Sequence, residues 1–181
     1  MPLRPILTYP SPVLKERAQP VANIGGEVAQ LIADLAETMY AAPGVGLAAP
    51  QVGAGQRIIV LDIHSENEEP GKRLLKLINP EIAERDGEIT WEEGCLSVPD
   101  LTVDVKRSRR VLVRAWTLDQ REIQVEAEEL LAVALQHEID HLEGKLLVDK
   151  ISRLKRDLYR TRQRKLERQG RPSERKPGLL I

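Results

Sequence analysis

The sequence predicts an α+β fold in which mixed or antiparallel sheets surround a central helix, with one more helix at the C-terminus. Three observations predict it. Apolar residues repeat at helical spacing in two separate segments. Short runs rich in Val, Ile and Leu, bounded by polar turns, occur between those segments. The 181 residues, 41% hydrophobic and 30% charged, are enough for one sizeable core.

The N-terminal part of the chain predicts an arm, a helix and a loop. Residues 1–24 are rich in proline and contain no long periodic run, so we expect an extended arm that lies over the domain. A helix follows, which Pro43 and Gly44 end. Its repeating apolar residues are Val28, Leu31, Ile32, Leu35 and Met39. Half of residues 44–51 are glycine or alanine, which predicts a tight loop whose backbone approaches a ligand closely.

The middle of the chain predicts the strands. Residues 57–61 and 74–78 are β-prone runs, separated by a polar loop at 64–72. Residues 111–116 and 122–125 flank the turn-prone pair Asp119 and Gln120, which indicates an antiparallel hairpin. We therefore expect a mixed or antiparallel sheet.

The central helix is predicted from about Glu128 to Leu142. Its inward stripe contains two histidines as well as apolar residues, and Gly144 stands where a helix often ends. The members of this stripe are Leu130, Ala134, His137 and His141.

This helix contains the string His137-Glu138-Ile139-Asp140-His141. Two histidines four residues apart project from the same helical face, so both can bind one metal ion. Glu138 is one step round the helix from that line, where it would act as a base and not as a ligand. The alternative is a helix with two ordinary surface histidines. We expect the central helix to be metal-binding.

The only cysteine, Cys95, offers a third ligand from a separate segment. A Cys-His-His set leaves one coordination position open and suits Zn²⁺, Fe²⁺, Co²⁺ or Ni²⁺. A single cysteine is also a common small core residue, so burial without a metal is the alternative.

The charge distribution separates the C-terminal segment from the rest. Residues 153–181 contain 11 Lys and Arg and 3 acidic residues, a net charge of +8. The remainder contains 16 basic and 25 acidic residues, a net charge of −9. We expect residues 1–152 to form the domain and 153–181 to form a basic helix, through about Arg168, and tail. Such a segment suits an RNA surface, and a merely solvated charged helix is the alternative.

No apolar run approaches the roughly 20 residues of a membrane span, and we expect no membrane association. The N-terminus lacks the pattern of a secretion signal, and one cysteine forms no internal disulfide. We expect a cytoplasmic protein that is a monomer.

Three segments together resemble the peptide deformylases, in order and approximate spacing. They are residues 44–51 (GVGLAAPQ), 93–97 (EGCLS) and 136–144 (QHEIDHLEG). The resemblance is to the bacterial type and covers about five-sixths of the chain. It implies an α+β enzyme that removes the formyl group from nascent chains beginning with N-formylmethionine and releases formate.

The resemblance also implies roles for individual residues. Cys95, His137 and His141 become the metal ligands, with Fe²⁺ the expected metal. Glu138 becomes the acid/base, and Gln51 and the Leu96 N–H stabilise the oxyanion. The implied basic C-terminal helix docks on ribosomal RNA. Substrate-binding residues are implied at Gly44, Val45, Gly46, Leu47, Trp91, Glu93, Gly94, Leu130, Val133 and Ala134.

Within that set, a methionine pocket is implied at Val45, Leu130, Val133 and Ala134, with Trp91 near its rim; ordinary core packing is the alternative. An ion pair between Asp140 and a basic residue such as Arg107 is also implied. Many bacterial members have an arginine in the stretch that here reads Asp100-Leu101-Thr102. The residues that would contact the peptide beyond its first residue are therefore not assigned.

Two other functions share some of these features. A zincin-type endopeptidase would use the same helix motif but would not need Cys95 as a ligand, and it would cut an internal peptide bond. A noncatalytic ribosome- or RNA-binding protein with a structural metal would leave Glu138 and Gln51 without a role, because structural sites are normally closed by four protein ligands.

Overall fold

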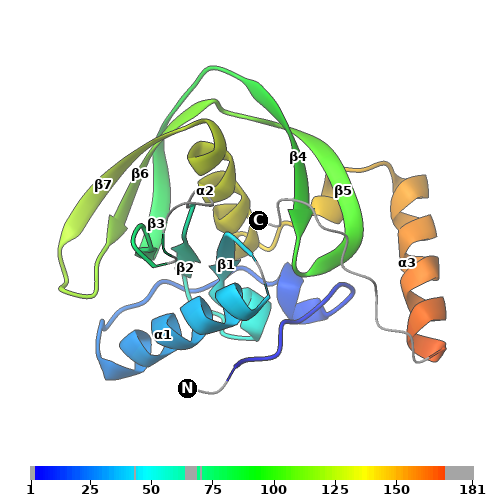
Figure 1. Cartoon of the computed structure of the whole chain (residues 1–181), viewed down its shortest axis with the longest axis horizontal. Coiled ribbons are helices and arrows are strands. Elements are labelled where there is room, and N and C mark those ends of the chain that lie inside the picture. Colours follow the sequence, from blue (N-terminus) through cyan, green and yellow to red (C-terminus); the bar gives the residue numbers. More distant parts are fainter. Residues whose placement is uncertain (1–2, 43, 64–68, 70, 170–181) are drawn as a thin grey trace.

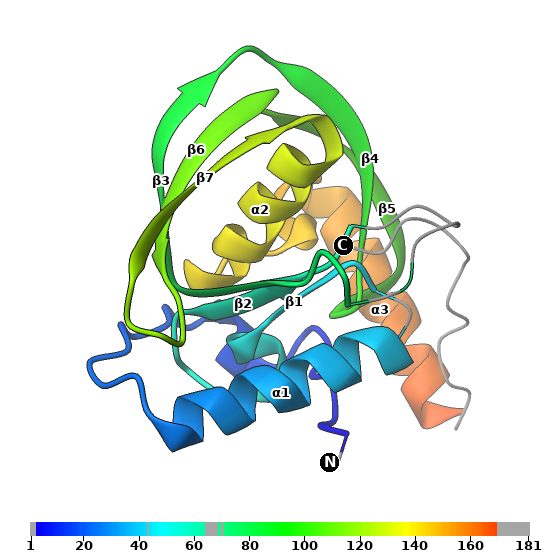
Figure 2. The same cartoon turned by 60° about the vertical axis from the view of Figure 1, so that its left-hand side comes forward.

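The computed structural model describes residues 3–169 except residues 43, 64–68 and 70. Its centre is helix α2 (Glu129–Leu142), which confirms the predicted central helix. Figures 1 and 2 show α2 enclosed between a curved sheet and a separate two-stranded hairpin, with α1 (Gly26–Ala41) below them. The expected α+β fold is confirmed. None of the helices in the described part of the chain combines the length and the apolar character of a membrane span.

The larger sheet has the order β1-β2-β3-β6-β7, and all of its neighbouring strands are antiparallel. The strands are β1 (Gly46–Ala48), β2 (Ile58–Leu61), β3 (Leu75–Asp86), β6 (Arg110–Trp116) and β7 (Glu122–Glu128). The hairpin predicted around Asp119 and Gln120 is confirmed, because β6 and β7 pair from Arg110 to Glu128.

Two strand predictions were wrong in part. Residues 46–48, expected within a loop, pair with β2 as a short strand, and Ala49–Val52 then form a 3-10 turn. Strand β3 was expected to end at 78 but continues to Asp86, with a register shift between Ile78 and Glu81. Backbone pairing with a neighbouring strand overrides the weak β-propensity of these segments.

A second hairpin, β4 (Ile89–Cys95) with β5 (Val98–Arg107), was not predicted as strands. Its alternation is obscured because two of its inward residues, Glu93 and Arg107, are charged. The hairpin delivers Cys95 to the side of α2.

Helix α1 confirms the first predicted helix. The five apolar residues of its predicted stripe are all buried, and the cluster that they form lies against β2. Of the two residues expected to end the helix, Pro43 lies outside the described residues. The helix thereby supports the sheet edge on which residues 46–48 lie.

Helix α3 (Arg153–Arg168) has the range expected for the basic C-terminal helix. It packs on the β4–β5 hairpin through buried Tyr159, whose hydroxyl donates to the Pro99 carbonyl at 2.8 Å. Leu154 and Leu158 remain 70% and 63% exposed on its outer side. The expected tail at 170–181 lies outside the described residues.

Candidate metal centre

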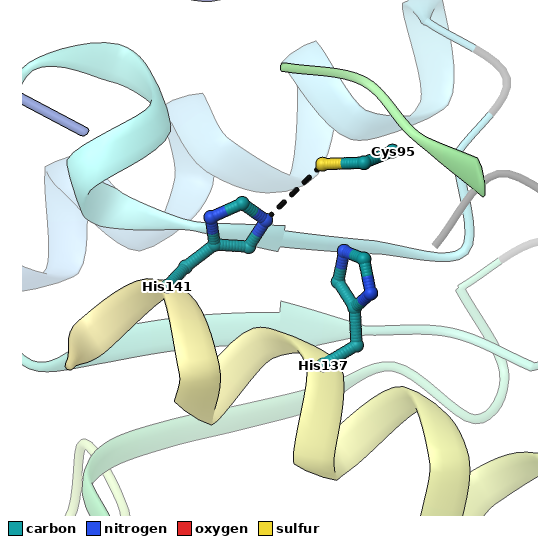
Figure 3. Close-up of side chains that lie close together, drawn as sticks. All are labelled: Cys95, His137 and His141. Atoms are coloured by element: carbon teal, nitrogen blue, oxygen red, sulfur yellow. Dashed lines mark hydrogen bonds between the residues drawn. The ribbon is translucent and has the colours of Figure 1, made fainter. Parts of the chain in front are cut away.

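Three buried side chains converge between the β4–β5 hairpin and α2. Cys95 ends β4, and His137 and His141 lie one helical turn apart on α2. One ligand atom from each residue lies within 4.8 Å of the others. Figure 3 shows both imidazoles turned toward the sulfur, with Cys95 Sγ 3.2 Å from His141 Nε2. The structure therefore brings together the three side chains that were predicted as metal ligands.

The unpaired atoms of this cluster fit a bound cation. His137 Nε2 is buried and has no hydrogen-bond partner among the described residues, although burying a polar atom unpaired is costly. Burial also lowers the pKa of His141 well below its ordinary value, so its ring is neutral and can donate a lone pair. Burial raises the pKa of the Cys95 thiol, which a neighbouring cation would oppose. Two imidazoles and a thiolate suit Zn²⁺ and similar transition metals.

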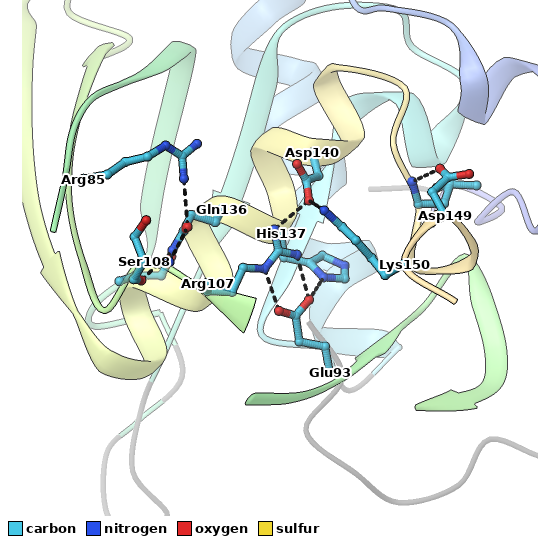
Figure 4. A network of polar contacts seen from close by, with 11 residues as sticks. Arg85, Glu93, Arg107, Ser108, Gln136, His137, Asp140, Asp149 and Lys150 are labelled. Atoms are coloured by element: carbon cyan, nitrogen blue, oxygen red, sulfur yellow. Dashed lines mark hydrogen bonds and ion pairs between the residues drawn. The ribbon is translucent and has the colours of Figure 1, made fainter. Parts of the chain in front are cut away.

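Glu93 orients the first histidine. Its Oε2 lies 2.8 Å from His137 Nδ1, and it also accepts two hydrogen bonds from Arg107 at 2.7 and 2.9 Å (Figure 4). Burial alone would raise the pKa of Glu93, but the bonds from Arg107 and His137 outweigh it and lower the pKa to about 2. The carboxylate can only accept, so Nδ1 donates its proton and Nε2 is free to bind a metal.

Arg107 joins this network to the outer side of α2. Its Nη1 donates to Asp140 Oδ2 at 2.6 Å, and Lys150 lies 3.4 Å from the same oxygen. The expected ion pair between Asp140 and Arg107 is confirmed. Both side-chain oxygens of Glu93 are used by His137 and Arg107. Its expected role in substrate binding stays a prediction.

Glu138 stands beside the cluster with neither oxygen paired to a described residue. It is fully buried, and burial, reinforced by the charge of Glu93, raises its pKa well above the ordinary value. Glycine at position 46 is what makes room for it, because a Cβ there would overlap Glu138 Oε1. A buried carboxylate with a raised pKa and no partner is suited to taking up and returning a proton.

Gln51 lies in the 3-10 turn that follows β1, and its side-chain amide is close to the Cys95 sulfur. Its Oε1 accepts from the Ala48 N–H at 2.8 Å, which fixes the orientation of the amide. Its Nε2 donates to Ser97 Oγ at 3.1 Å and lies 3.9 Å from Cys95 Sγ. An amide donor is thus held at the edge of the candidate metal position.

The expected substrate-binding residues fall into two groups. Val45, Trp91, Val133 and Ala134 belong to one apolar cluster beside α2. Leu130 is half-buried and lies outside that cluster. Its neighbour Leu131, and not Leu130, packs against the cluster. Gly44 and Leu96 lie in contact, since a Cβ at 44 would be 2.8 Å from Leu96 Cδ1. Gly46, Leu47 and Gly94 lie on β1 and β4, which flank the cluster of ligands.

No role was predicted for Gln136, the residue before His137 on α2, although its side chain holds this helix in place. Gln136 accepts from Arg85 Nη1 at 2.9 Å and from the Ser108 N–H at 3.0 Å, and donates to the Ser108 carbonyl at 2.8 Å (Figure 4). These bonds fasten α2 to the β5–β6 turn. A glutamine next to a candidate metal ligand on the apolar helix was the available signal, because a buried amide needs partners.

Comparisons with known proteins agree on one family. The family model described as polypeptide deformylase matches residues 3–157. The chain is 50% identical over 165 residues to the peptide deformylase of Syntrophobacter fumaroxidans, covering 91% of this chain and 96% of that protein. It is also 50% identical over 171 residues to that of Alkalilimnicola ehrlichii, covering 94% of each.

Solved structures give the same result. A crystal structure of a peptide deformylase from Legionella pneumophila superposes with a TM-score of 0.85 at 42% identity, covering 94% of this chain and 99% of that one. The Ehrlichia chaffeensis peptide deformylase in complex with actinonin gives 0.86 at 34% identity, covering 93% and 99%.

Proposed function

The chain belongs to the peptide deformylase family, and from this premise we propose the residue roles, metal and partners given below. The protein is a metallohydrolase that removes the N-formyl group from nascent polypeptides. One observation supports the residue roles above all. A thiol and two imidazoles converge within 4.8 Å, beside a buried carboxylate that has no partner among the described residues.

Cys95, His137 and His141 hold one divalent cation, with His137 oriented by Glu93. When bound, the cation acts as a Lewis acid that polarises the formyl carbonyl and lowers the pKa of coordinated water. Glu138 takes the proton from the attacking water. Its raised pKa makes it a stronger base than an exposed carboxylate, and burial keeps bulk water from competing for the proton.

The oxygen of that water bonds to the formyl carbon as the carbonyl π bond breaks, so negative charge develops on the formyl oxygen. The Gln51 amide, fixed by the Ala48 N–H, and the Leu96 N–H donate to that oxygen. Glu138 returns its proton to the departing amine nitrogen as the C–N bond breaks. The products are formate and a free N-terminus.

The metal in the cell is Fe²⁺, while Zn²⁺, Ni²⁺ and Co²⁺ also bind the same donors. Held by Cys95, His137 and His141, Zn²⁺ would be less active, because it prefers four ligands and would resist an additional one from the substrate. Forms loaded anaerobically with each metal test this proposal by their turnover. Equal turnover by the zinc form would contradict it.

The methionine side chain of the substrate enters the apolar cluster of Val45, Val133 and Ala134, with Trp91 at its rim. Leu130, half-buried at the start of α2, contributes from outside the cluster. Residues 44–47 and 93–94 approach the backbone of the peptide. Substitution of Val133 by a larger residue should therefore raise KM for formyl-Met peptides.

Residues 1–152 form the catalytic domain, and residues 153–181 are a basic appendage that docks on ribosomal RNA. The exposed cations of α3 support this partner: Arg153, Lys155, Arg160, Arg162, Arg164, Lys165 and Arg168. The protein works in the cytoplasm as a monomer, where nascent N-formylmethionyl chains emerge.

The decisive assay offers the anaerobically purified enzyme a formyl-Met peptide and, separately, an unformylated peptide of the same sequence. We expect formate from the first and no cleavage of either chain. Cleavage of an internal bond would favour the endopeptidase, and a metal-loaded protein that releases no formate would favour a structural site.

A further inference from the structure

The N-terminal arm contacts the three chain segments that carry the site. Figure 1 shows it in blue, passing below β1 and the tip of the β4–β5 hairpin on its way to α1. The Leu7 N–H donates to the Gln51 carbonyl at 2.7 Å, and the Tyr9 N–H donates to the Ser97 carbonyl at 2.8 Å. Further along, the Ala18 N–H donates to Leu142, the last residue of α2, at 2.9 Å.

The N–H groups of Leu7 and Tyr9, two residues apart, both point toward segments of the site. N–H groups at positions i and i+2 lie on one edge where a chain is locally extended, and its side chains alternate between two faces. Leu7 and Tyr9 are half-buried, whereas Thr8 between them is exposed. One short stretch of arm therefore joins two segments that are 46 residues apart in sequence.

The two acceptor residues are also joined on the active-site side. Gln51 Nε2 donates to Ser97 Oγ at 3.1 Å, next to Cys95 Sγ. Gln51 and Ser97 are thus fixed twice, once by the side-chain bond between them and once by the arm. A shift of either backbone would move the Gln51 amide relative to the Cys95 sulfur.

Apolar packing holds the arm in this position. Leu7, Tyr9 and Leu14 belong to the same apolar cluster as Cys95, and Leu14 is 1% exposed. Gly144, just after α2, lies directly against the carbonyl of Lys15, where a Cβ would overlap it. The arm is therefore a packed part of the domain, and its amides are fixed donors.

We propose that the N–H groups of Leu7 and Tyr9 are positioning groups for deformylation. The Leu7 N–H sets the position of the Gln51 amide, and the Tyr9 N–H sets the segment from Cys95 to Ser97. Neither touches the substrate. This inference rests on the roles of Gln51 and Cys95 proposed above, and it assigns to the arm a part in the reaction that is separate from its contribution to stability.

Amide-to-ester replacement tests the proposal, because an α-hydroxy acid at one position removes a single N–H and leaves the side chain. Esters are placed in the full-length protein at Leu7, Tyr9 and Gln19 by suppressor-tRNA translation. Gln19 is the matched control, since its N–H donates to the Gly55 carbonyl at 2.8 Å and contacts none of the proposed ligand, acid/base or oxyanion residues. An ester at Thr8, whose N–H has no hydrogen bond to any described residue, controls for the chemistry itself.

All three esters at bonded amides should lower Tm to a similar extent. The Leu7 ester should lower kcat about tenfold with little change in KM and unchanged cobalt affinity, because only the oxyanion donor moves. The Tyr9 ester should weaken cobalt retention against a chelator and change the sulfur-to-cobalt absorption band. The Gln19 and Thr8 esters should keep kcat and cobalt affinity within about twofold of wild type.

The proposal is overturned if the Leu7 and Tyr9 esters retain kcat, cobalt affinity and the absorption band as well as the Gln19 ester does at equal loss of Tm. A failure of the proposed function itself would look different, because the unmodified enzyme would then release no formate. Cobalt affinity and the absorption band are read without turnover, so they test the Tyr9 contact independently of activity.

Discussion

Gly46 and Glu138 pack so closely that a side chain at position 46 would displace the carboxylate. A Cβ built on Gly46 would overlap Glu138 Oε1 and lie 3.0 Å from both Cδ and Cγ. Glu138 is fully buried on α2, so it has little room to adjust. The absence of a side chain on β1 is therefore a condition for the position of the proposed acid/base.

The Gly46→Ala variant should lose activity through this contact. Displacement of Glu138 by about 1 Å should reduce kcat by about 100-fold, while the three metal ligands remain in place. Formate release and metal content measure the two effects. The control is Gly55→Ala, where nothing lies within 4 Å of the added Cβ. A Gly46→Ala enzyme with wild-type kcat would show that Glu138 does not need this position.

The Glu93→Gln variant should hold its metal less tightly. Loss of the carboxylate charge weakens the hydrogen bond that orients His137. It also leaves the buried positive charge of Arg107 without the negative charge of Glu93 beside it. We expect the metal affinity to fall about 10- to 100-fold, measured by competition with a chelator. Glu88→Gln, just before β4, removes an exposed carboxylate paired with Lys106 of the same hairpin and should have no effect. Equal metal affinity in the two variants would contradict the role of Glu93.

Asp149 should make stability depend on pH. Partial burial opposes ionisation of Asp149, but the Lys15 ammonium, the Leu146 N–H and the charge of Arg156 together lower its pKa below the ordinary value. A lowered folded-state pKa stabilises the protein above the unfolded-state pKa, about 3.9, and this stabilisation is lost as pH falls through the folded-state value.

The Asp149→Asn variant should therefore be less stable than wild type from pH 7 down to about pH 4, with the difference shrinking below that. Because the pair is partly exposed, the difference at pH 7 should be about 1 kcal/mol or less. Urea unfolding at several pH values measures it. A difference that grows as the pH falls would have the wrong sign for this account.

Charge reversal on α3 should weaken binding to ribosomes without changing chemistry. Arg160→Glu with Arg164→Glu alters two exposed residues and leaves buried Tyr159 and Gln163 in place. Co-sedimentation with ribosomes should fall and should become less sensitive to salt, because phosphate contacts release counterions.

Lys76→Glu with Arg121→Glu is the matched control for the α3 variant. It changes the net charge equally, at two exposed positions on the body of the protein. Release of formate from a short peptide should be unchanged in both double variants. Equal co-sedimentation of the two would argue against α3 as the docking surface.

The sequence predicted those parts of the structure that local patterns determine. Helix α2 and its two histidines follow from spacing alone, and the β6–β7 hairpin follows from a polar turn between two β-prone runs. Strand β1 could not be predicted in this way, because its Gly-Leu-Ala sequence is extended only through its pairing with β2.

The residues that orient the candidate ligands were harder to predict than the ligands themselves. Glu93 and Arg107 are charged residues that face inward. The free-energy cost of burying them is offset only when β4, β5 and α2 bring the two charges together. Likewise, nothing in the proline-rich arm indicates that its amides reach Gln51 and Ser97. Contacts between distant segments depend on the completed fold.

Glu138 is proposed to move a proton at a cation held by Cys95, His137 and His141. The most direct test measures formate release and bound metal together in the Glu138→Gln variant, purified anaerobically beside wild type. We predict one equivalent of metal in both proteins, formate release by wild type, and none above background by the variant. Undiminished formate release by the metal-loaded variant would contradict the account.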